Sequence, residues 1–211
     1  MPRWRIAPGM KLFNLSLLRA ATLLAVALLS HTVAGAESAP DAQKPVGSHY
    51  YPNGMLRQEI EQTRSRRTDR TFYASGVMQR ELIWAMNGNT PVMERDVEFS
   101  PAGVMLRERR WAAGEPLSDL EFLASGVLAS RKDYSGLGST RELLVQTYFS
   151  SGVLSSQQRF ALPQRGAPYL IGIQKKFSTG GHPVSEQVFD ERGQLVGEKA
   201  WSASGQLLPA R

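Results

Sequence analysis

Cysteine is absent from the 211 residues, and histidine occurs only three times. The absence of cysteine excludes disulfides, thiol chemistry and the lipid-modified cysteine of a lipoprotein anchor, so packing and strand pairing must hold the fold. The histidines lack chemical partners, because neither a His-x-x-x-His nor a Gly-x-Ser-x-Gly pattern occurs. We therefore expect no catalytic residue, no metal site, no cofactor and no enzymatic activity.

Long apolar runs are also missing, apart from one stretch near the N-terminus. Basic residues there precede an apolar stretch and then small residues, in the order Arg3, Arg5 and Lys11, then Leu12–Leu29 interrupted by Arg19, then Ala34-Gly35-Ala36. This order predicts a secretory signal peptide at 1–36, cleaved after Ala36, and therefore a periplasmic or secreted protein. A membrane anchor is the alternative, but the uninterrupted run Ala20–Leu29 is well below the roughly 20 residues of a span. Met10 opens a more compact signal and is an alternative start.

Without residues 1–36, the chain has no large excess of positive or negative charge. The whole chain carries 25 basic and 19 acidic residues, but four of the basic ones lie before residue 37. The remaining charge of about +2 does not favour a nucleic-acid partner. One basic cluster could contact an anionic surface, although a solvated strand or loop is the plainer interpretation: Arg64, Arg66, Arg67 and Arg70.

Glycine, by contrast, recurs in a fixed context, with an aromatic residue four positions before it and often Leu or Met two positions after it. The glycines are Gly54, Gly76, Gly103, Gly126, Gly152, Gly181, Gly193 and Gly205, and their aromatic residues are Tyr50, Phe72, Phe99, Phe122, Tyr148, Phe177, Phe189 and Trp201. With 19 glycines and 9% aromatic residues, chance predicts about two such pairs. Weaker copies, at Trp84–Gly88, Trp111–Gly114 and Tyr134–Gly138, indicate a unit of about twelve residues.

The motif predicts a β-hairpin with a three-residue loop in which the glycine adopts a positive φ. Such a loop places the aromatic residue directly across from the Leu or Met, on the same sheet face, where the pair stabilises the hairpin. Asn53, Ser75 and Ser125 stand immediately before their glycines, where turns favour them.

These features predict an all-β fold: an elongated antiparallel meander of roughly a dozen short strands with a stacked aromatic stripe. A closed barrel or a curled sheet is the alternative. About 175 residues follow residue 36, enough for one domain with a core. We expect a signal peptide at 1–36, a short flexible segment at 37–49 and a repeat domain at 50–211.

The phrases Tyr50-Tyr-Pro-Asn-Gly54-Met-Leu-Arg-Gln-Glu59 and Phe72-Tyr-Ala-Ser-Gly76-Val-Met-Gln-Arg-Glu81 resemble the MORN-repeat variant of YwqK-type antitoxin proteins. The resemblance covers most of 50–207. It includes an acidic residue five positions after the glycine, at Glu59, Glu81, Glu108, Glu186 and Glu198, whereas Arg131 and Gln157 depart from it. It implies a β-rich binding surface that in some members neutralises a partner toxin.

The leading functional hypothesis is therefore an exported, non-enzymatic protein-binding module, of an antitoxin or immunity type. The alternative is a cell-envelope scaffold that binds lipid headgroups or peptidoglycan through the basic cluster. The recurring glutamates are expected at solvent-facing strand positions, paired with neighbours such as Arg57, Arg80 and Arg107. No stable membrane span is expected after cleavage.

Overall fold

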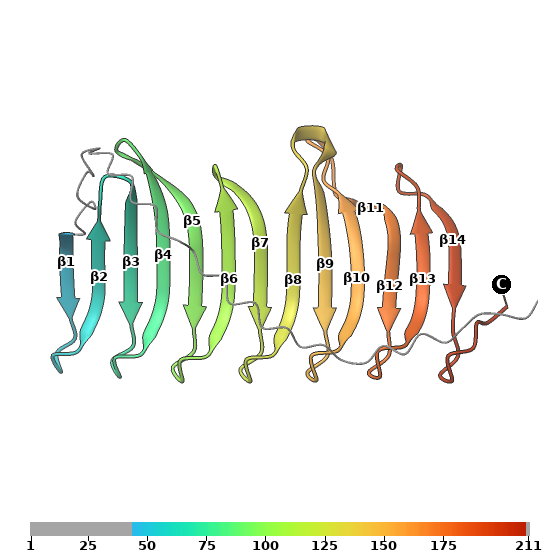
Figure 1. Ribbon diagram of the computed structural model, residues 1–211, viewed down its shortest axis with the longest axis horizontal. Helices are drawn as coiled ribbons and strands as arrows, with labels where there is room; N and C mark the ends of the chain where they lie inside the picture. Colours follow the sequence, from blue (N-terminus) through green and yellow to red (C-terminus); the bar gives the residue numbers. More distant parts are fainter. Residues whose placement is uncertain (1–43, 210–211) are drawn as a thin grey trace, which may run out of the picture. The chain divides into compact units, whose positions relative to one another are not determined.

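The computed structural model describes residues 44–209, which form one antiparallel sheet of 14 strands (Figure 1). The strands are β1 Lys44–Tyr50, β2 Leu56–Gln62, β3 Arg66–Phe72, β4 Met78–Asn87, β5 Thr90–Phe99, β6 Met105–Ala112, β7 Glu115–Phe122, β8 Leu128–Ser135, β9 Glu142–Tyr148, β10 Leu154–Ala161, β11 Tyr169–Leu170, β12 Gly172–Phe177, β13 Pro183–Phe189 and β14 Leu195–Ala200. A 3₁₀ turn, η1, covers Gly138–Thr140. The predicted signal peptide and its cleavage after Ala36 lie outside the described residues.

The strands pair in sequence order from β1 to β10 and continue through β12, β13 and β14, while β11 pairs with β10. The predicted antiparallel meander is confirmed, and the sheet is open, with β1 at one end of the row and β14 at the other. The first strand begins at Lys44, so part of the segment 37–49 that we expected to be flexible is paired with β2.

Turn chemistry explains why the chain reverses where it does. The motif glycines all have φ values between 80° and 85°. In each turn the N–H three positions before the glycine donates to the carbonyl one position after it, as from Tyr51 to Met55 at 2.8 Å. The aromatic residue then faces the residue two positions after the glycine, as in Phe72↔Met78 and Phe122↔Leu128. The predicted three-residue loop and cross-strand pair are confirmed.

The two ends of the strands carry different connections. The turns at Gly54, Gly76, Gly103, Gly126, Gly152, Gly181 and Gly205 share one end, which we call the glycine-turn end. The turn at Gly193 lies at the opposite end, between β13 and β14. The weaker copies also fall at the opposite end, as the tight turns at Gly88 and Ala113–Gly114 and the loop around Gly138. A twelve-residue step is thus one strand plus one turn.

The sheet has no conventional core. Among the described residues only two apolar side chains are buried, Ile83 and Val97, whereas five polar or charged ones are: Thr68, Asp96, Glu108, Asp119 and Gln174. We expected one domain with a core, and in this part of the chain few apolar side chains form it. A single layer of strands leaves both faces accessible to solvent, so long polar side chains must cover the strands.

Candidate functional site

The cross-strand register arranges charged side chains in rows on both faces of the sheet. We call the face that presents Glu59, Glu81 and Glu108 the glutamate face, and the face that presents Asp96 and Asp119 the aspartate face. Successive residues of a strand point to opposite faces, and paired residues share one face. Each face therefore has its own set of ion pairs.

On the glutamate face, arginines bridge glutamates of neighbouring strands from β2 to β6. Arg70 on β3 reaches Glu59 at 3.3 Å, Glu61 at 3.0 Å and Glu81 at 3.2 Å. Arg95 on β5 continues the series, to Glu81 at 3.3 Å and to Glu108 at 2.7 Å. These ion pairs flank Val97, which is fully buried beside Arg95 on β5. The apolar stems of long arginine side chains commonly cover apolar strand positions in this way.

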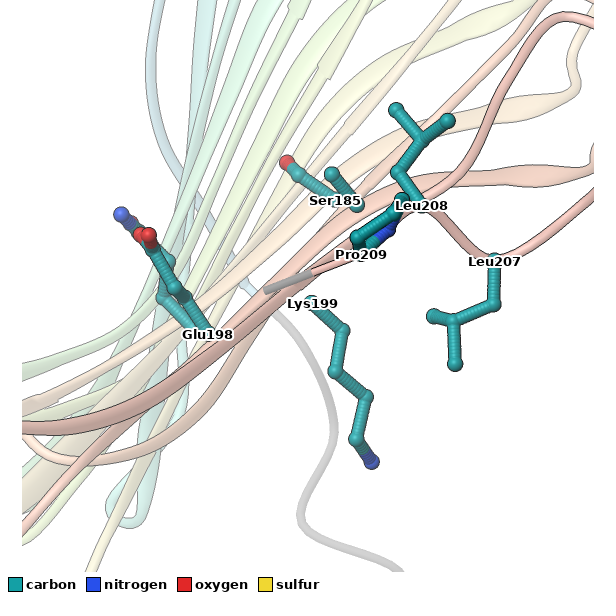
Figure 2. A pocket seen from close by; sticks show the side chains of 8 residues that line it. Ser185, Glu198, Lys199, Leu207, Leu208 and Pro209 are labelled. Carbon is teal, nitrogen blue, oxygen red and sulfur yellow. The ribbon is translucent and has the colours of Figure 1, made fainter. Parts of the chain in front are cut away.

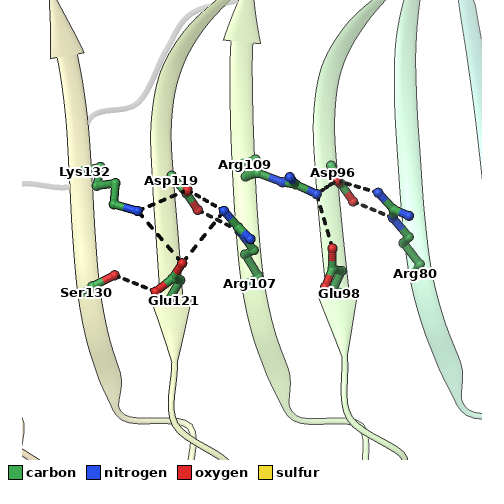
Figure 3. A network of polar contacts seen from close by, with 9 residues as sticks. All are labelled: Arg80, Asp96, Glu98, Arg107, Arg109, Asp119, Glu121, Ser130 and Lys132. Atoms are coloured by element: carbon green, nitrogen blue, oxygen red, sulfur yellow. Dashed lines mark hydrogen bonds and ion pairs between the residues drawn. The ribbon is translucent and has the colours of Figure 1, made fainter. Parts of the chain in front are cut away.

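On the aspartate face, a second network joins β4 to β8 (Figure 3). Arg80 binds Asp96 through two N–H···O contacts of 2.9 Å, and Arg109 binds the same carboxylate from the other side. Arg107 binds Asp119 in the same two-pronged way, at 2.9 and 2.7 Å. Lys132 on β8 lies 3.8 Å from Asp119 and closes the network.

The expected pairing of the glutamates with Arg57, Arg80 and Arg107 is wrong, and of the five recurring glutamates only Glu198 is exposed. Arg80 and Arg107 bind aspartates on the other face, and Arg57 lies over the ring of Tyr51, 5.8 Å from its centroid. Arg80 and Glu81 are adjacent on one strand and so point to opposite faces. Glu108, far from solvent-facing, is only 6% exposed.

Two carboxylates in these networks have shifted pKa values. Burial acts to raise the pKa of Asp96, but the hydrogen bonds and charges of Arg80 and Arg109 outweigh it and lower that pKa below its usual value. Glu108 behaves alike, because Arg95 and Arg110 outweigh its burial and lower its pKa. Both groups stay ionised at neutral pH and act as structural anions.

The basic cluster predicted near β3 is divided between the two faces. Arg67 lies on the aspartate face, bound to Asp69 at 2.8 Å and 5.4 Å from the ring centroid of Trp84. Arg70 lies on the glutamate face among three carboxylates. Arg66 is exposed at the start of β3, and Arg64 precedes it in the turn. The fold therefore does not assemble the four arginines on one surface, so this geometry does not favour an anionic ligand there.

Seven of the eight predicted pairs of aromatic residue and glycine lie at the glycine-turn end, and the pair Phe189 and Gly193 lies at the opposite end. Phe72, Phe99 and Phe122 are half-buried, whereas Tyr50, in the first strand, is 63% exposed. A Cβ added at Gly126 would touch Val104 of the preceding turn at 3.7 Å. Hydroxyl groups add further links, because Tyr51 donates to the Phe72 carbonyl at 2.7 Å. We interpret these residues as structural.

A hollow of about 610 Å³ lies at the opposite end, where three connections meet. They are the β6–β7 turn, the loop from β8 to β9 and the loop after β10. Its lining is mainly apolar: Ala112, Ala113, Pro116, Leu117, Tyr134, Leu137, Leu162 and Pro163. The volume falls within the roughly 300–1,000 Å³ of ligand pockets in general.

Two charged residues, Arg141 and Glu115, also line this hollow. The Arg141 guanidinium lies 5.5 Å from the ring centroid of Tyr134 and binds Glu115 at 2.6 Å and the Pro116 carbonyl at 3.4 Å. Leu137, at the tip of the β8–β9 loop, is 81% exposed. Tyrosine and arginine are enriched at the centres of protein interfaces, so Tyr134 and Arg141 beside the exposed Leu137 are suited to contacting a protein surface.

Sequence reasoning missed these residues because it followed the repeat, and the hollow is built where the repeat is interrupted. A signal was present, since Gly136-Leu137-Gly138 and the stretch 163–168, with Pro163, Gly166 and Pro168, break the strand pattern. Insertions between repeats commonly form loops on one side of a repeat protein, often its binding side.

The comparison with protein families supports the repeat. A model described as "MORN repeat variant" matches residues 46–62, which comprise most of β1, the Gly54 turn and β2. The same strand, glycine turn and strand recur at the turns of Gly76, Gly103, Gly126, Gly152 and Gly181. A search of curated proteins found no match.

Within residues 44–209, no group of three or more His, Asp or Glu side chains is placed to hold a metal ion. In that same part of the chain, no helix has the length and apolar character needed to cross a membrane.

Proposed function

We propose that this protein is an exported, non-enzymatic repeat module that binds another protein, and that the hollow beside Leu137 is the anchor site for that partner. The MORN repeat match is compatible with a protein-binding repeat module. The observation that carries the proposal is the exposed Leu137 over an apolar hollow, at the place where the repeat is interrupted. Loops on a rigid scaffold commonly carry function.

The charged faces support a scaffold role rather than a binding role for the central strands. Most of the arginines between β3 and β8 already contact carboxylates of this chain, so a ligand would have to displace existing ion pairs there. An apolar side chain of a partner that inserts into the hollow displaces no ion pair. The partner is expected to present a large apolar side chain beside Tyr134 and Leu137.

The biological setting belongs to the same proposal. The basic, apolar and small-residue order of residues 1–36 supports export to the periplasm. An immunity role, in which the protein masks a toxin acting in the envelope, follows from the resemblance to antitoxin repeats. It requires that deletion of the protein make cells sensitive to the captured partner, and unchanged survival of the deletion strain would contradict it.

The binding site is tested by photo-crosslinking in intact cells. We expect a photoreactive phenylalanine analogue at position 137 to capture one discrete protein, whereas the same group at Val46, which is 61% exposed on β1, captures none. Co-precipitation of that protein should be lost with Leu137→Asp and kept with Val46→Asp. Equal crosslinking from both positions, or crosslinking to lipid alone, would contradict the proposal.

A further inference from the structure

The two outer edges of the sheet differ in how they are protected. An unpaired edge strand presents a row of N–H and C=O groups that can pair with another strand, and proteins block such edges with proline, bulges or charge. On β1 the edge is interrupted, because Pro45 has no N–H and the register shifts between Pro45 and Gly47. β14 contains no proline, although its register with β13 also shifts once, between Leu195 and Gly197.

The chain itself shows that the outer edge of β14 can accept a strand. After the Gly205 turn, Trp201 and Leu207 form a β-bridge, and the Leu208 N–H donates to the Ala200 carbonyl at 2.8 Å. Pro209, the last residue that the structure describes, has no N–H to donate. Because alternate residues of a strand direct their backbone groups to the same side, Glu198 points its backbone groups outward as Ala200 does. Val196 lies in the register shift and has no partner residue in β13. Within residues 44–209 no other strand pairs with Glu198 or Val196.

A hollow of about 440 Å³ lies at this edge, lined by Ser185, Gln187, Glu198, Lys199, Ala200, Leu207, Leu208 and Pro209 (Figure 2). It adjoins a smaller hollow that shares Ser185 and Gln187 and extends toward β10. The space beside β14 is therefore bordered by strand edge, amide and hydroxyl side chains and two exposed leucines.

Glu198 differs from the other glutamates at the same motif position. Its glycine, Gly193, is at the opposite end of the strands, so Glu198 pairs with Gln187 and lies on the aspartate face. Within the described residues the Glu198 carboxylate forms no ion pair or hydrogen bond, whereas Glu186 on the other face is bound by Lys175 and Lys199. The edge thus offers a free carboxylate.

We propose that the outer edge of β14 binds an extended segment of a partner protein by strand addition, with a lysine or arginine of that segment opposite Glu198. This inference rests on the proposed function as a protein-binding module and adds a second contact. Backbone hydrogen bonds supply affinity in strand addition, and side chains beside the edge supply selectivity. A second copy of this chain is less suited to this edge. If its β14 paired here, the second Glu198 carboxylate would repel the first, and its β1 edge is interrupted at Pro45.

The test uses fluorescence anisotropy with the full protein and a fluorescein-labelled hexapeptide, Thr-Lys-Val-Lys-Val-Thr. A peptide with glutamate in place of both lysines is the control. We expect the lysine peptide to bind and the glutamate peptide to bind at least about tenfold more weakly. Glu198→Lys should reverse the order of the two peptides.

Backbone pairing is tested separately from charge. Val196→Pro removes the N–H of a residue that has no partner in β13 and is 63% exposed, and Val196→Thr keeps that N–H. Binding should fall about tenfold or more with Val196→Pro and change little with Val196→Thr. Circular dichroism of both variants checks the fold, and Glu198→Lys remains informative if the proline variant unfolds.

Several outcomes would overturn the inference. The lysine peptide could fail to bind the unaltered protein, or Val196→Pro could bind it as tightly as the unaltered protein does. Light scattering could also show a dimer that Val196→Pro converts to a monomer. If Val196→Pro keeps the crosslinked partner while Leu137→Asp loses it, the proposed function stands and strand addition at β14 fails.

Discussion

At the scale of single residues, the glycine-turn end depends on backbone conformation more than on space. Gly126 has φ 83°, and a Cβ there would meet Val104 at an ordinary contact distance of 3.7 Å. We therefore expect Gly126→Val to lower the free energy of unfolding by about 1 to 2 kcal/mol, mainly through the disfavoured φ. Urea unfolding measures this, with Ser125→Ala in the same turn as the control. A cost equal to that of the control would show that the turn adopts another conformation.

Ala113 is the one non-glycine residue with positive φ among residues 44–209, at 50° in the β6–β7 turn. Two-residue hairpin turns of this kind prefer Asn followed by Gly, and Gly114 already occupies the second position. Ala113→Asn is expected to raise the free energy of unfolding by about 0.5 to 1 kcal/mol. Thermal unfolding measures the gain, and Ala112→Asn on the adjacent strand should give none.

At the scale of the strand, two charge networks replace much of the apolar packing that a second layer would provide. Asp96 is 2% exposed and is bound by Arg80 and Arg109 from either side, so it holds β4, β5 and β6 together. When one member of a buried ion pair is removed, the charge of the other member is left uncompensated. The resulting loss of folding free energy is larger than the net stabilisation that the ion pair provides. The carboxylates on β5 and β6 are therefore structural elements of the sheet.

These carboxylates make stability depend on pH. The folded pKa values of Asp96 and Glu108 are lowered, so their contribution is present above the unfolded values of about 3.9 and 4.3 and is lost as pH falls through the folded values. The urea midpoint should drop steeply below about pH 4. Asp96→Asn should cost about 1 to 2 kcal/mol at pH 7 and flatten this drop. Glu191→Gln, in the exposed β13–β14 turn, is the matched control, and an equally steep drop in Asp96→Asn would contradict the assignment.

At the scale of the whole sheet, the strands of residues 44–209 pair in sequence order, except that β10 pairs with both β11 and β12. Stability in such an arrangement is a sum of local units and their interfaces. The buried residues Ile83 and Val97 and both charge networks lie around β4, β5 and β6, whereas β14 carries mostly exposed side chains.

Hydrogen exchange should follow this distribution. We expect backbone amides of β4, β5 and β6 to exchange slowest, and those of β1 and β14 to exchange at least about tenfold faster. Mass spectrometry of peptic fragments measures the difference. Uniform protection from β1 to β14 would mean that the sheet opens as one cooperative unit instead.

Local chemistry made much of the fold predictable. The turn positions, the pairing of Phe72 with Met78, and the meander order all follow from residues within about seven positions of each other, so one sequence suffices for them. The same locality misled the assignment of charge partners. Arg80 stands beside Glu81 in the chain, but alternation of faces sends it to Asp96, sixteen residues away.

The sequence by itself determined the repeat, the all-β class and the ends at which the strands turn, because a glycine turn imposes its geometry on the residues next to it. Only the tertiary structure decided which carboxylates are buried, where Leu137 and Arg141 meet Tyr134, and that β14 leaves a free Glu198 beside an open edge. These depend on the combined register of several strands, in which each bulge shifts the pairing by one residue and thereby changes which side chains meet.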